Sequence, residues 1–208
     1  MQNRLIASFA IALCFFHIAA AQKINFTGDG LAFTRYKDGN IVRVDPRTLS
    51  ETVILKKELL ASDSNRQMEI RSYDYSADNQ KVLMFTNTAR VWRYHTRGDY
   101  WVASASGITS KRLGKGLPPQ SLMFAKFSPD GKTIAYVSEH NIYSEDVNTG
   151  VIRKLTKDGS RQMINGTFDW VYEEEFGCRD GFRWSPDGRH IAFWQVNAAK
   201  TKDFFMIN

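Results

Sequence analysis

Ser128-Pro129-Asp130-Gly131 and Ser185-Pro186-Asp187-Gly188 are two copies of one phrase, and Ser76-Ala77-Asp78 is a weaker third copy. The serines are 52 and 57 residues apart, which is the length of a four-stranded propeller blade with its loops. Proline presets the second position of a β-turn and glycine relieves the fourth, so each phrase predicts a tight turn between antiparallel strands. The repeat therefore indicates structure rather than catalysis.

Short β-rich runs alternate with turn formers from Gly30 onward, and no amphipathic stretch has the length of a normal helix. The predicted strands span residues 31–36, 41–44, 52–55, 81–86, 132–138, 141–144, 151–155 and 189–196. We therefore expect an all-β fold, a partial β-propeller of about three four-stranded blades. Because a closed propeller needs at least four blades, we expect the chain to be the front part of a larger protein.

The N-terminal segment has the pattern of a secretory signal peptide. Arg4 precedes an apolar run over residues 5–20, and the run ends in Ala19-Ala20-Ala21. The run is near the lower limit for a membrane span, but its small-residue end favours cleavage. We predict a signal peptide over residues 1–21, a mature domain over residues 22–208 without a membrane span, and a secreted or periplasmic location.

Charge and cysteine content narrow the function. The formal net charge of +6 comes from scattered basic residues, and no dense basic run tracks a nucleic-acid backbone, so no nucleic acid is expected as a partner. After removal of the leader, Cys178 is the only cysteine, so no intrachain disulfide can form. A buried small side chain is the favoured interpretation of Cys178, and a reactive thiol is the alternative.

Recognisable catalytic and metal-binding motifs are missing. The sequence contains no Gly-x-Ser-x-Gly, no His-Glu-x-x-His and no phosphate-binding glycine loop. The histidines show no ligand spacing, and the turn that begins at Asp146 has Lys157 where a calcium loop needs an acid. We therefore expect no metal, no cofactor and no catalytic residue, which leaves open whether this chain alone is an enzyme.

Residues 169–175, Asp-Trp-Val-Tyr-Glu-Glu-Glu, place three glutamates beside aromatic side chains. Like charges about 4 Å apart repel by roughly 4 kcal/mol at an effective dielectric near 20, and crowding raises a carboxylate pKa unless a counter-charge is bound. We expect Trp170, Tyr172 and Phe176 to pack against a sheet and to leave the carboxylates fixed on the other side. A substrate ammonium is one suitable counter-charge, and a solvated acidic turn or helix start is the alternative.

Three phrases carry a resemblance to a known family. They are residues 165–175 (Asn-Gly-Thr-Phe-Asp-Trp-Val-Tyr-Glu-Glu-Glu), 184–188 (Trp-Ser-Pro-Asp-Gly) and 191–197 (Ile-Ala-Phe-Trp-Gln-Val-Asn). The pattern resembles the N-terminal propeller of dipeptidyl peptidase IV, in the prolyl oligopeptidase class of serine peptidases, and the acidic motif is specific to the dipeptidyl-peptidase branch. The similarity covers residues 31–208 and is strongest after Ser121.

The resemblance implies a role in proteolysis. In that family an eight-bladed propeller covers an α/β-hydrolase domain that carries a Ser-Asp-His triad, and dipeptides are released from free N-termini after proline or alanine. The resemblance implies that Glu174 and Glu175 bind the substrate α-ammonium and that Arg93 contacts the substrate backbone. The implied partners are a peptide with a free N-terminus and the C-terminal hydrolase domain, which is absent from residues 22–208. A homodimer of the full-length protein stays open.

Local sequence around these residues adds one conditional expectation and one departure from the family pattern. If residues 91–94, Val-Trp-Arg-Tyr, form a strand, Arg93 points away from the face that Trp92 and Tyr94 share. Cys178-Arg179-Asp180 departs from the less polar sequence expected after the glutamates.

Other interpretations remain for the chain as a whole. One alternative is a propeller-like module that binds peptides or proteins without hydrolysis, and another is a truncated product without function. Asn25-Phe26-Thr27 and Asn165-Gly166-Thr167 match the glycosylation acceptor pattern, although the second is better explained as turn chemistry.

Overall fold

The structure is a computed structural model that describes residues 24–56, 58, 69–106 and 109–202. The predicted signal peptide over residues 1–21 and the apolar C-terminal residues 203–208 lie outside the described residues.

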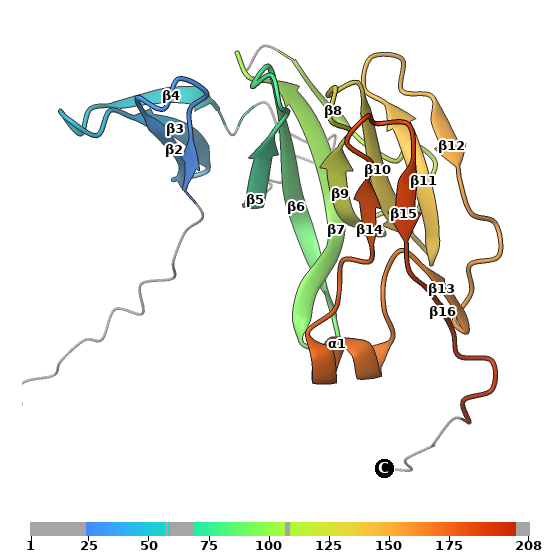
Figure 1. The fold of residues 1–208 in the computed structure, drawn as a ribbon. Coiled ribbons are helices and arrows are strands. Elements are labelled where there is room, and N and C mark those ends of the chain that lie inside the picture. The colour runs from blue at the N-terminus through green and yellow to red at the C-terminus, as the bar shows by residue number, and fades with distance from the viewer. Residues whose placement is uncertain (1–23, 57, 59–68, 107–108, 203–208) are drawn as a thin grey trace, which may run out of the picture.

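Antiparallel strands that follow one another along the chain form three four-stranded blades and part of a fourth (Figure 1). Blade I contains β1 (Asn25–Phe26), β2 (Phe33–Lys37), β3 (Asn40–Val44) and β4 (Glu51–Leu55). Blade II contains β5 (Ile70–Tyr75), β6 (Lys81–Val91), β7 (Tyr94–Ser104) and β8 (Ser110–Arg112). Blade III contains β9 (Leu122–Phe127), β10 (Thr133–Ser138), β11 (Asn141–Asp146) and β12 (Ile152–Lys154). The prediction of an all-β partial propeller with about three complete blades is therefore confirmed.

Blade IV is represented by β13 (Met163–Asn165), β14 (Phe182–Trp184), β15 (Ile191–Phe193) and β16 (Gln195–Asn197). β14 pairs with β15, and β13 pairs with β16. The described helix, α1 (Trp170–Phe176), lies between β13 and β14 in the chain. The strand predicted over residues 189–196 is thus two strands, with a break at Trp194.

Blades II and III join in one eight-stranded sheet because β7 also pairs with β9. This contact is short and pairs Arg97 with Met123 and Gly98 with Leu122. A Cβ on Gly98 would lie 2.6 Å from the carbonyl oxygen of Thr86, so only glycine allows this close approach of β6 and β7.

The ribbon of β6 and β7 extends well past the predicted strand over residues 81–86. We call residues 87–98 the arm. At its tip Val91 pairs with Tyr94, and Trp92 and Arg93 form the turn between the strands. The condition that residues 91–94 form a strand is not met, because Trp92 has φ +51° and the chain reverses direction there.

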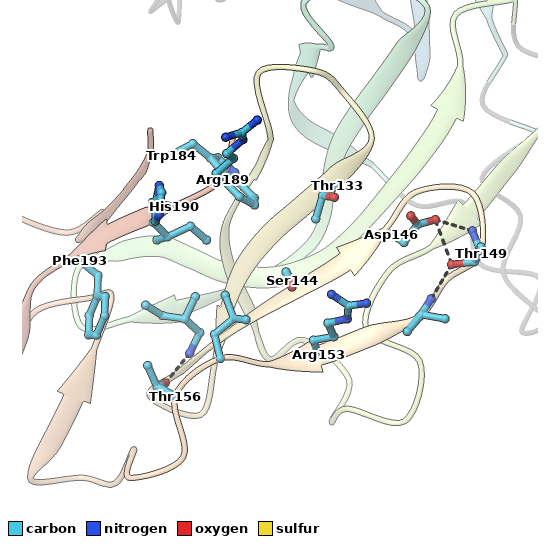
Figure 2. A pocket seen from close by; sticks show the side chains of 14 residues that line it. Thr133, Ser144, Asp146, Thr149, Arg153, Thr156, Trp184, Arg189, His190 and Phe193 are labelled. Carbon is cyan, nitrogen blue, oxygen red and sulfur yellow. Dashed lines mark hydrogen bonds between the residues drawn. The ribbon is translucent and has the colours of Figure 1, made fainter. Parts of the chain in front are cut away.

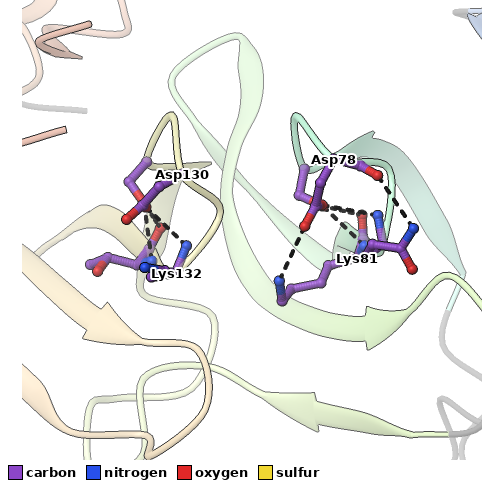
Figure 3. A network of polar contacts seen from close by, with 8 residues as sticks. Asp78, Lys81, Asp130 and Lys132 are labelled. Atoms are coloured by element: carbon purple, nitrogen blue, oxygen red, sulfur yellow. Dashed lines mark hydrogen bonds and ion pairs between the residues drawn. The ribbon is translucent and has the colours of Figure 1, made fainter. Parts of the chain in front are cut away.

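A serine or threonine closes the turn between the first two strands of every blade. In blade III, the Ser128 hydroxyl donates to Asp130 at 2.6 Å and accepts from the Thr133 N–H at 3.0 Å. The Asp130 carboxylate also accepts from the Lys132 N–H, as Figure 3 shows beside the equivalent turn at Asp78. Ser76 and Ser185 make the same bonds. The predicted tight turns are confirmed.

The structure also reveals a fourth copy of this turn, at Thr27-Gly28-Asp29-Gly30 in blade I. The Thr27 hydroxyl donates to Asp29 at 2.5 Å and accepts from the Ala32 N–H at 3.1 Å. This copy is not evident from the sequence because threonine replaces serine and glycine replaces proline. The hydroxyl and the carboxylate, rather than the proline, are the features that all four copies share.

Apolar layers lie between successive blades. The layer between blades I and II contains Ile41, Leu55, Ile70, Tyr73, Val82, Met84 and Ala103. The layer between blades II and III contains Leu83, Phe85, Tyr100, Val102, Leu113, Leu122, Ile134, Tyr136, Tyr143 and Val147. Val82 and Met84 thus face one blade and Leu83 faces the other, because side chains alternate along a strand.

The same alternation connects blades III and IV. In β10, Ile134 and Tyr136 face blade II, whereas Ala135 and Val137 pack in a buried cluster with Phe182 of blade IV. Each central strand is therefore apolar on both faces, and blade IV is seated on blade III through its first strand.

Removal of the turn hydroxyl is expected to destabilise the chain in proportion to the burial of the turn. Ser128 is 3% exposed, so Ser128→Ala leaves the partly buried Thr133 N–H without its acceptor and should lower the free energy of unfolding by about 1–3 kcal/mol. Ser185→Ala, in a more exposed turn, should cost less. Urea unfolding of both variants checks this, and equal losses would contradict the role of burial.

The turn carboxylates are expected to make stability depend on pH in the acid range. The hydrogen bond from the Ser128 hydroxyl, with that from the Lys132 N–H, holds the pKa of Asp130 below its ordinary value. A depressed carboxyl pKa stabilises the folded state above the unfolded pKa of about 3.9, and this advantage disappears as pH falls through the folded pKa. The stability difference between the native chain and Asp130→Asn should shrink between about pH 5 and pH 2. A difference that is constant over this range would refute the prediction.

Candidate functional site

The acidic motif lies in an insertion that interrupts the first strand of blade IV. We define the insertion as residues 166–181. The Gly181 N–H donates to the Gly166 carbonyl at 3.0 Å. The Gly166 N–H donates to the Trp194 carbonyl, and the Trp194 N–H donates to the Gly181 carbonyl, both at 2.9 Å. These bonds close a neck at the base of the insertion, so β13 and β14 behave as the two halves of one strand.

Close packing explains the glycines of this neck. A Cβ on Gly181 would lie 2.9 Å from the carbonyl carbon of Gly166. Gly166 itself has φ +74°, and a Cβ there would lie 2.9 Å from side-chain atoms of Val137 and Ile142 in blade III. The insertion therefore leaves the blade at a point where only glycine fits.

Local sequence sets both ends of α1. The Asp169 carboxylate accepts from the Tyr172 N–H at 3.1 Å, which is an N-cap. Gly177 adopts φ +64°, and the N–H groups of Gly177 and Cys178 bond the carbonyls of Glu173 and Tyr172. The alternative of a helix start is thus present, as a helix of seven residues.

The prediction for the aromatic flanks is wrong. Trp170, Tyr172 and Phe176 are 50%, 43% and 68% exposed, so they do not pack against a sheet. Residues four apart share one face of a helix, and the ring of Tyr172 accordingly contacts those of Phe168 and Phe176 in tilted arrangements. The expectation assumed that alternate side chains face opposite sides, as in a strand, but this segment is a helix.

Helical geometry turns the first two of the three glutamates inward instead. Glu173 is 5% exposed and the side chain of Glu174 is 10% exposed, whereas Glu175 is exposed. Oε1 of Glu173 and Oε1 of Glu174 are both buried without a hydrogen-bond partner. A solvated acidic surface would not hold its carboxylates in this way.

The structure brings Arg93 to this cluster. Nε of Arg93 lies 2.9 Å from Oε2 of Glu174, although the arginine side chain is 74% exposed. The arm and the insertion, far apart in the sequence, therefore meet at this ion pair. Glu175 follows on the exposed side of α1, so two of the three predicted site residues are in contact and the third lies next to them.

Two further residues belong to the same contact and were not singled out from the sequence. The guanidinium carbon of Arg179 lies 3.6 Å from the ring centroid of Tyr94, a cation–π geometry. Nε of Arg179 lies 3.6 Å from Oε1 of Glu173. Burial raises the pKa of Glu173, Arg179 opposes this shift, and the charge of Glu174 adds to it. The unexpected polarity of Cys178-Arg179-Asp180 was the only sequence signal for this contact.

A buried aspartate fixes the base of the arm. Asp99 is 5% exposed and accepts from Arg112 at 2.8 Å, from the Gln120 N–H at 2.9 Å and from Asn87 at 2.7 Å. These donors come from the arm, from β8 and from the loop before β9, so the direction of the arm is set by a well-bonded carboxylate.

A lysine fixes the return from α1 to blade IV. Nζ of Lys126 lies 2.5 Å from a carboxylate oxygen of Asp180 and 3.0 Å from the Phe182 carbonyl. Cys178, just before this anchor, is half-buried, so the full burial expected for it is not found.

Comparison with known proteins decides the family. A family model described as "Dipeptidyl peptidase IV (DPP IV) N-terminal region" matches residues 76–208. The chain belongs to this family. The resemblance to the DPP IV N-terminal region that was inferred from the acidic motif and the turn phrases is thereby confirmed.

Relatives and solved structures agree with this assignment. Probable dipeptidyl-aminopeptidase B of Chaetomium globosum is 32% identical over 69% of this chain and 17% of its own length, and that of Tuber melanosporum is 30% identical over 85% and 20%. Dipeptidyl peptidase 4 of Porphyromonas gingivalis superposes with a TM-score of 0.73 at 27% identity, over 85% of this chain and 25% of that one. The chain thus spans about a fifth of the curated relatives. Putative TolB of Agrobacterium tumefaciens, at 19% identity and a TM-score of 0.50, shares the fold alone.

Of two cavities in the described residues, one is lined partly by the insertion and the other is not. One of about 910 Å³ is lined by residues that include Trp92, Glu173 and Arg179, but not by Glu174 or Glu175. The other, of about 630 Å³, lies between the β11–β12 face of blade III and the β14–β15 hairpin (Figure 2). Its apolar lining comes from both blades, and it contains none of the predicted site residues.

Remaining expectations concern metals, membranes and glycans. Within the described residues, no three histidine, cysteine, aspartate or glutamate side chains are grouped to hold a metal ion, and no helix is long and apolar enough to cross a membrane. Asn165 is fully buried and donates to His140 and Asp158, so its side chain serves packing in the folded chain. Asn25 donates to the Tyr73 carbonyl at 3.3 Å.

Gly181→Ala is expected to distort the neck of the insertion. The new methyl group would press on the backbone of Gly166, and overpacking of this kind costs about 1–3 kcal/mol. Gly181, unlike Gly116, does not have a positive φ, so the cost at Gly181 is steric rather than conformational. A midpoint of urea unfolding for Gly181→Ala equal to that of the native chain would contradict the steric account.

Proposed function

We propose that this region recognises the free N-terminus of peptide substrates for a secreted serine dipeptidyl peptidase that releases X-Pro and X-Ala dipeptides. The observation that carries the proposal is the buried Glu174 carboxylate, which has one oxygen 2.9 Å from Arg93 and the other without a hydrogen-bond partner. Membership of the DPP IV N-terminal region supports the enzyme class.

A substrate α-ammonium has the chemistry that this carboxylate lacks. It offers three N–H donors and a positive charge, and charge-assisted hydrogen bonds to a carboxylate are about twice as strong as neutral ones. In the proposal, Oε1 of Glu174 accepts one donor and the exposed Glu175 carboxylate accepts another. Binding then supplies the hydrogen bond that a buried oxygen needs and reduces the repulsion within the glutamate cluster.

Arg93 has donors left for the substrate backbone. It contacts Glu174 through Nε, and its side chain is otherwise 74% exposed. A guanidinium has five N–H donors, so the same arginine can hold Glu174 and donate to a substrate carbonyl. This dual contact would place the first peptide unit at a fixed distance from the ammonium.

The same arrangement accounts for exopeptidase specificity. An internal peptide segment has no positive charge and would cover the carboxylates without pairing them. Leaving a buried charged group unpaired is strongly unfavourable, so the site would reject internal segments as well as attract free N-termini.

Hydrolysis itself requires residues beyond this region. In the proposal, an α/β-hydrolase domain supplies the Ser-Asp-His triad, and the leader over residues 1–21 directs the protein to the periplasm or the exterior. The propeller region contributes substrate selection, and the hydrolase domain contributes the nucleophile.

In the full-length protein, Glu174→Gln or Glu175→Gln should lower kcat/KM for X-Pro substrates with a free amine by more than tenfold. The physical reason is the loss of a charge-assisted hydrogen bond of roughly 1.5–3 kcal/mol. Glu139→Gln, an exposed glutamate on the wall of the larger cavity, is the control for a change of charge alone. Unchanged kinetics in both Glu174→Gln and Glu175→Gln would reject the ammonium-binding role.

A further inference from the structure

A second link between α1 and the arm lies beside the ion pair of Arg93 and Glu174. Arg179 stacks on Tyr94, the chain neighbour of Arg93, with 3.6 Å from the guanidinium carbon to the ring centroid. Arg179 also lies 3.6 Å from Glu173, the chain neighbour of Glu174. The tip of the arm is thus held by two parallel links made by adjacent residues on each side.

The two carboxylates of these links face different spaces. Glu173 and Arg179 line the cavity of about 910 Å³, and Glu174 does not. Oε1 of each glutamate is buried without a hydrogen bond, so the two carboxylates differ in the arginine that each one faces. Glu173 faces Arg179 within the insertion, whereas Glu174 faces Arg93 at the tip of the arm.

The fold gains little from the charge of Glu173. Its carboxylate is 5% exposed, its Oε1 accepts no hydrogen bond, and burial raises its pKa. A raised carboxyl pKa means that the ionised form is less favourable in the folded state than in the unfolded chain at neutral pH. A role in stability alone would therefore be served better by a neutral side chain of the same shape.

We propose that Glu173 is a positioning residue for the ammonium site. It orients Arg179, whose stacking on Tyr94 fixes the tip of the arm against α1 and so sets the placement of Arg93 relative to Glu174. The inference rests on the proposed function of Glu174. It assigns the three consecutive glutamates different tasks, with the first holding the arm and the other two binding the substrate.

The test is a titration of the chain with glycyl-proline amide and with its N-acetylated form, followed by NMR through the indole N–H of Trp92 at the tip of the arm. Glu173→Gln should weaken binding of the free amine on the order of tenfold, because small misplacements of binding groups are costly, and should leave the acetylated form unaffected. The thermal midpoint should stay the same or rise, because a buried charge has been removed. Arg179→Lys, which keeps the charge but loses the planar stack on Tyr94, should reduce discrimination in the same way.

The outcomes separate this inference from the proposed function. Lost discrimination in Glu174→Gln with unchanged discrimination in Glu173→Gln and Arg179→Lys would overturn the positioning role and leave the function standing. Unchanged discrimination in Glu174→Gln would overturn both. A lower thermal midpoint of Glu173→Gln, with equal weakening for both peptides, would show a structural role only and would also overturn the inference. In the Glu174→Gln background, Glu173→Gln should add no further loss, and the control Glu139→Gln should behave as the native chain.

Discussion

Burial of both faces of each central strand is the constraint on which the rest of the structure depends. Val82 and Leu83 are neighbours in β6, yet they are buried in different layers, one toward blade I and one toward blade III. A sheet that is apolar on both faces is stable only between two others, so the blades must stack in series. Segments that carry the candidate site must therefore be added to the blades without disturbing these apolar layers. The arm and the insertion meet that requirement because both extend beyond the ends of the blades.

The site depends on these two extensions meeting. The turn at Trp92 presents Arg93, and the helix in the insertion presents Glu174, and neither element carries the contact alone. The burial of two neighbouring carboxylates costs stability, which the interblade layers can offset because their apolar area is much larger. Two buried carboxylate oxygens keep unmet hydrogen-bonding capacity, a feature that opposes folding and that the proposed ligand would satisfy.

Much of the blade architecture could be predicted from the sequence, because Ser128-Pro129-Asp130-Gly131 and its copies use local chemistry that recurs at blade length. Thr27 escaped detection because the shared feature is a hydroxyl paired with a carboxylate two residues later, which different residues can supply. The reversal at Trp92 was not predictable, since nothing local favours φ above zero at a tryptophan. For α1, seven residues are too few for a periodic signal, and the ion pair of Glu174 depends on an arm far away in the sequence.

Separate polar contacts hold the base of the arm and the base of the insertion, so the unpaired carboxylates at the tip do not weaken the packing of the blades. Asp99 ties the base of the arm with bonds from three donors, and Lys126 holds Asp180 where the insertion rejoins β14. Both anchors are paired, whereas the carboxylates at the tip keep oxygens without hydrogen bonds. Between them the backbone passes through a neck of glycines that is closed by its own hydrogen bonds. The proposed ligand would therefore contact only the tip of the arm and α1, and the interblade layers can remain as they are.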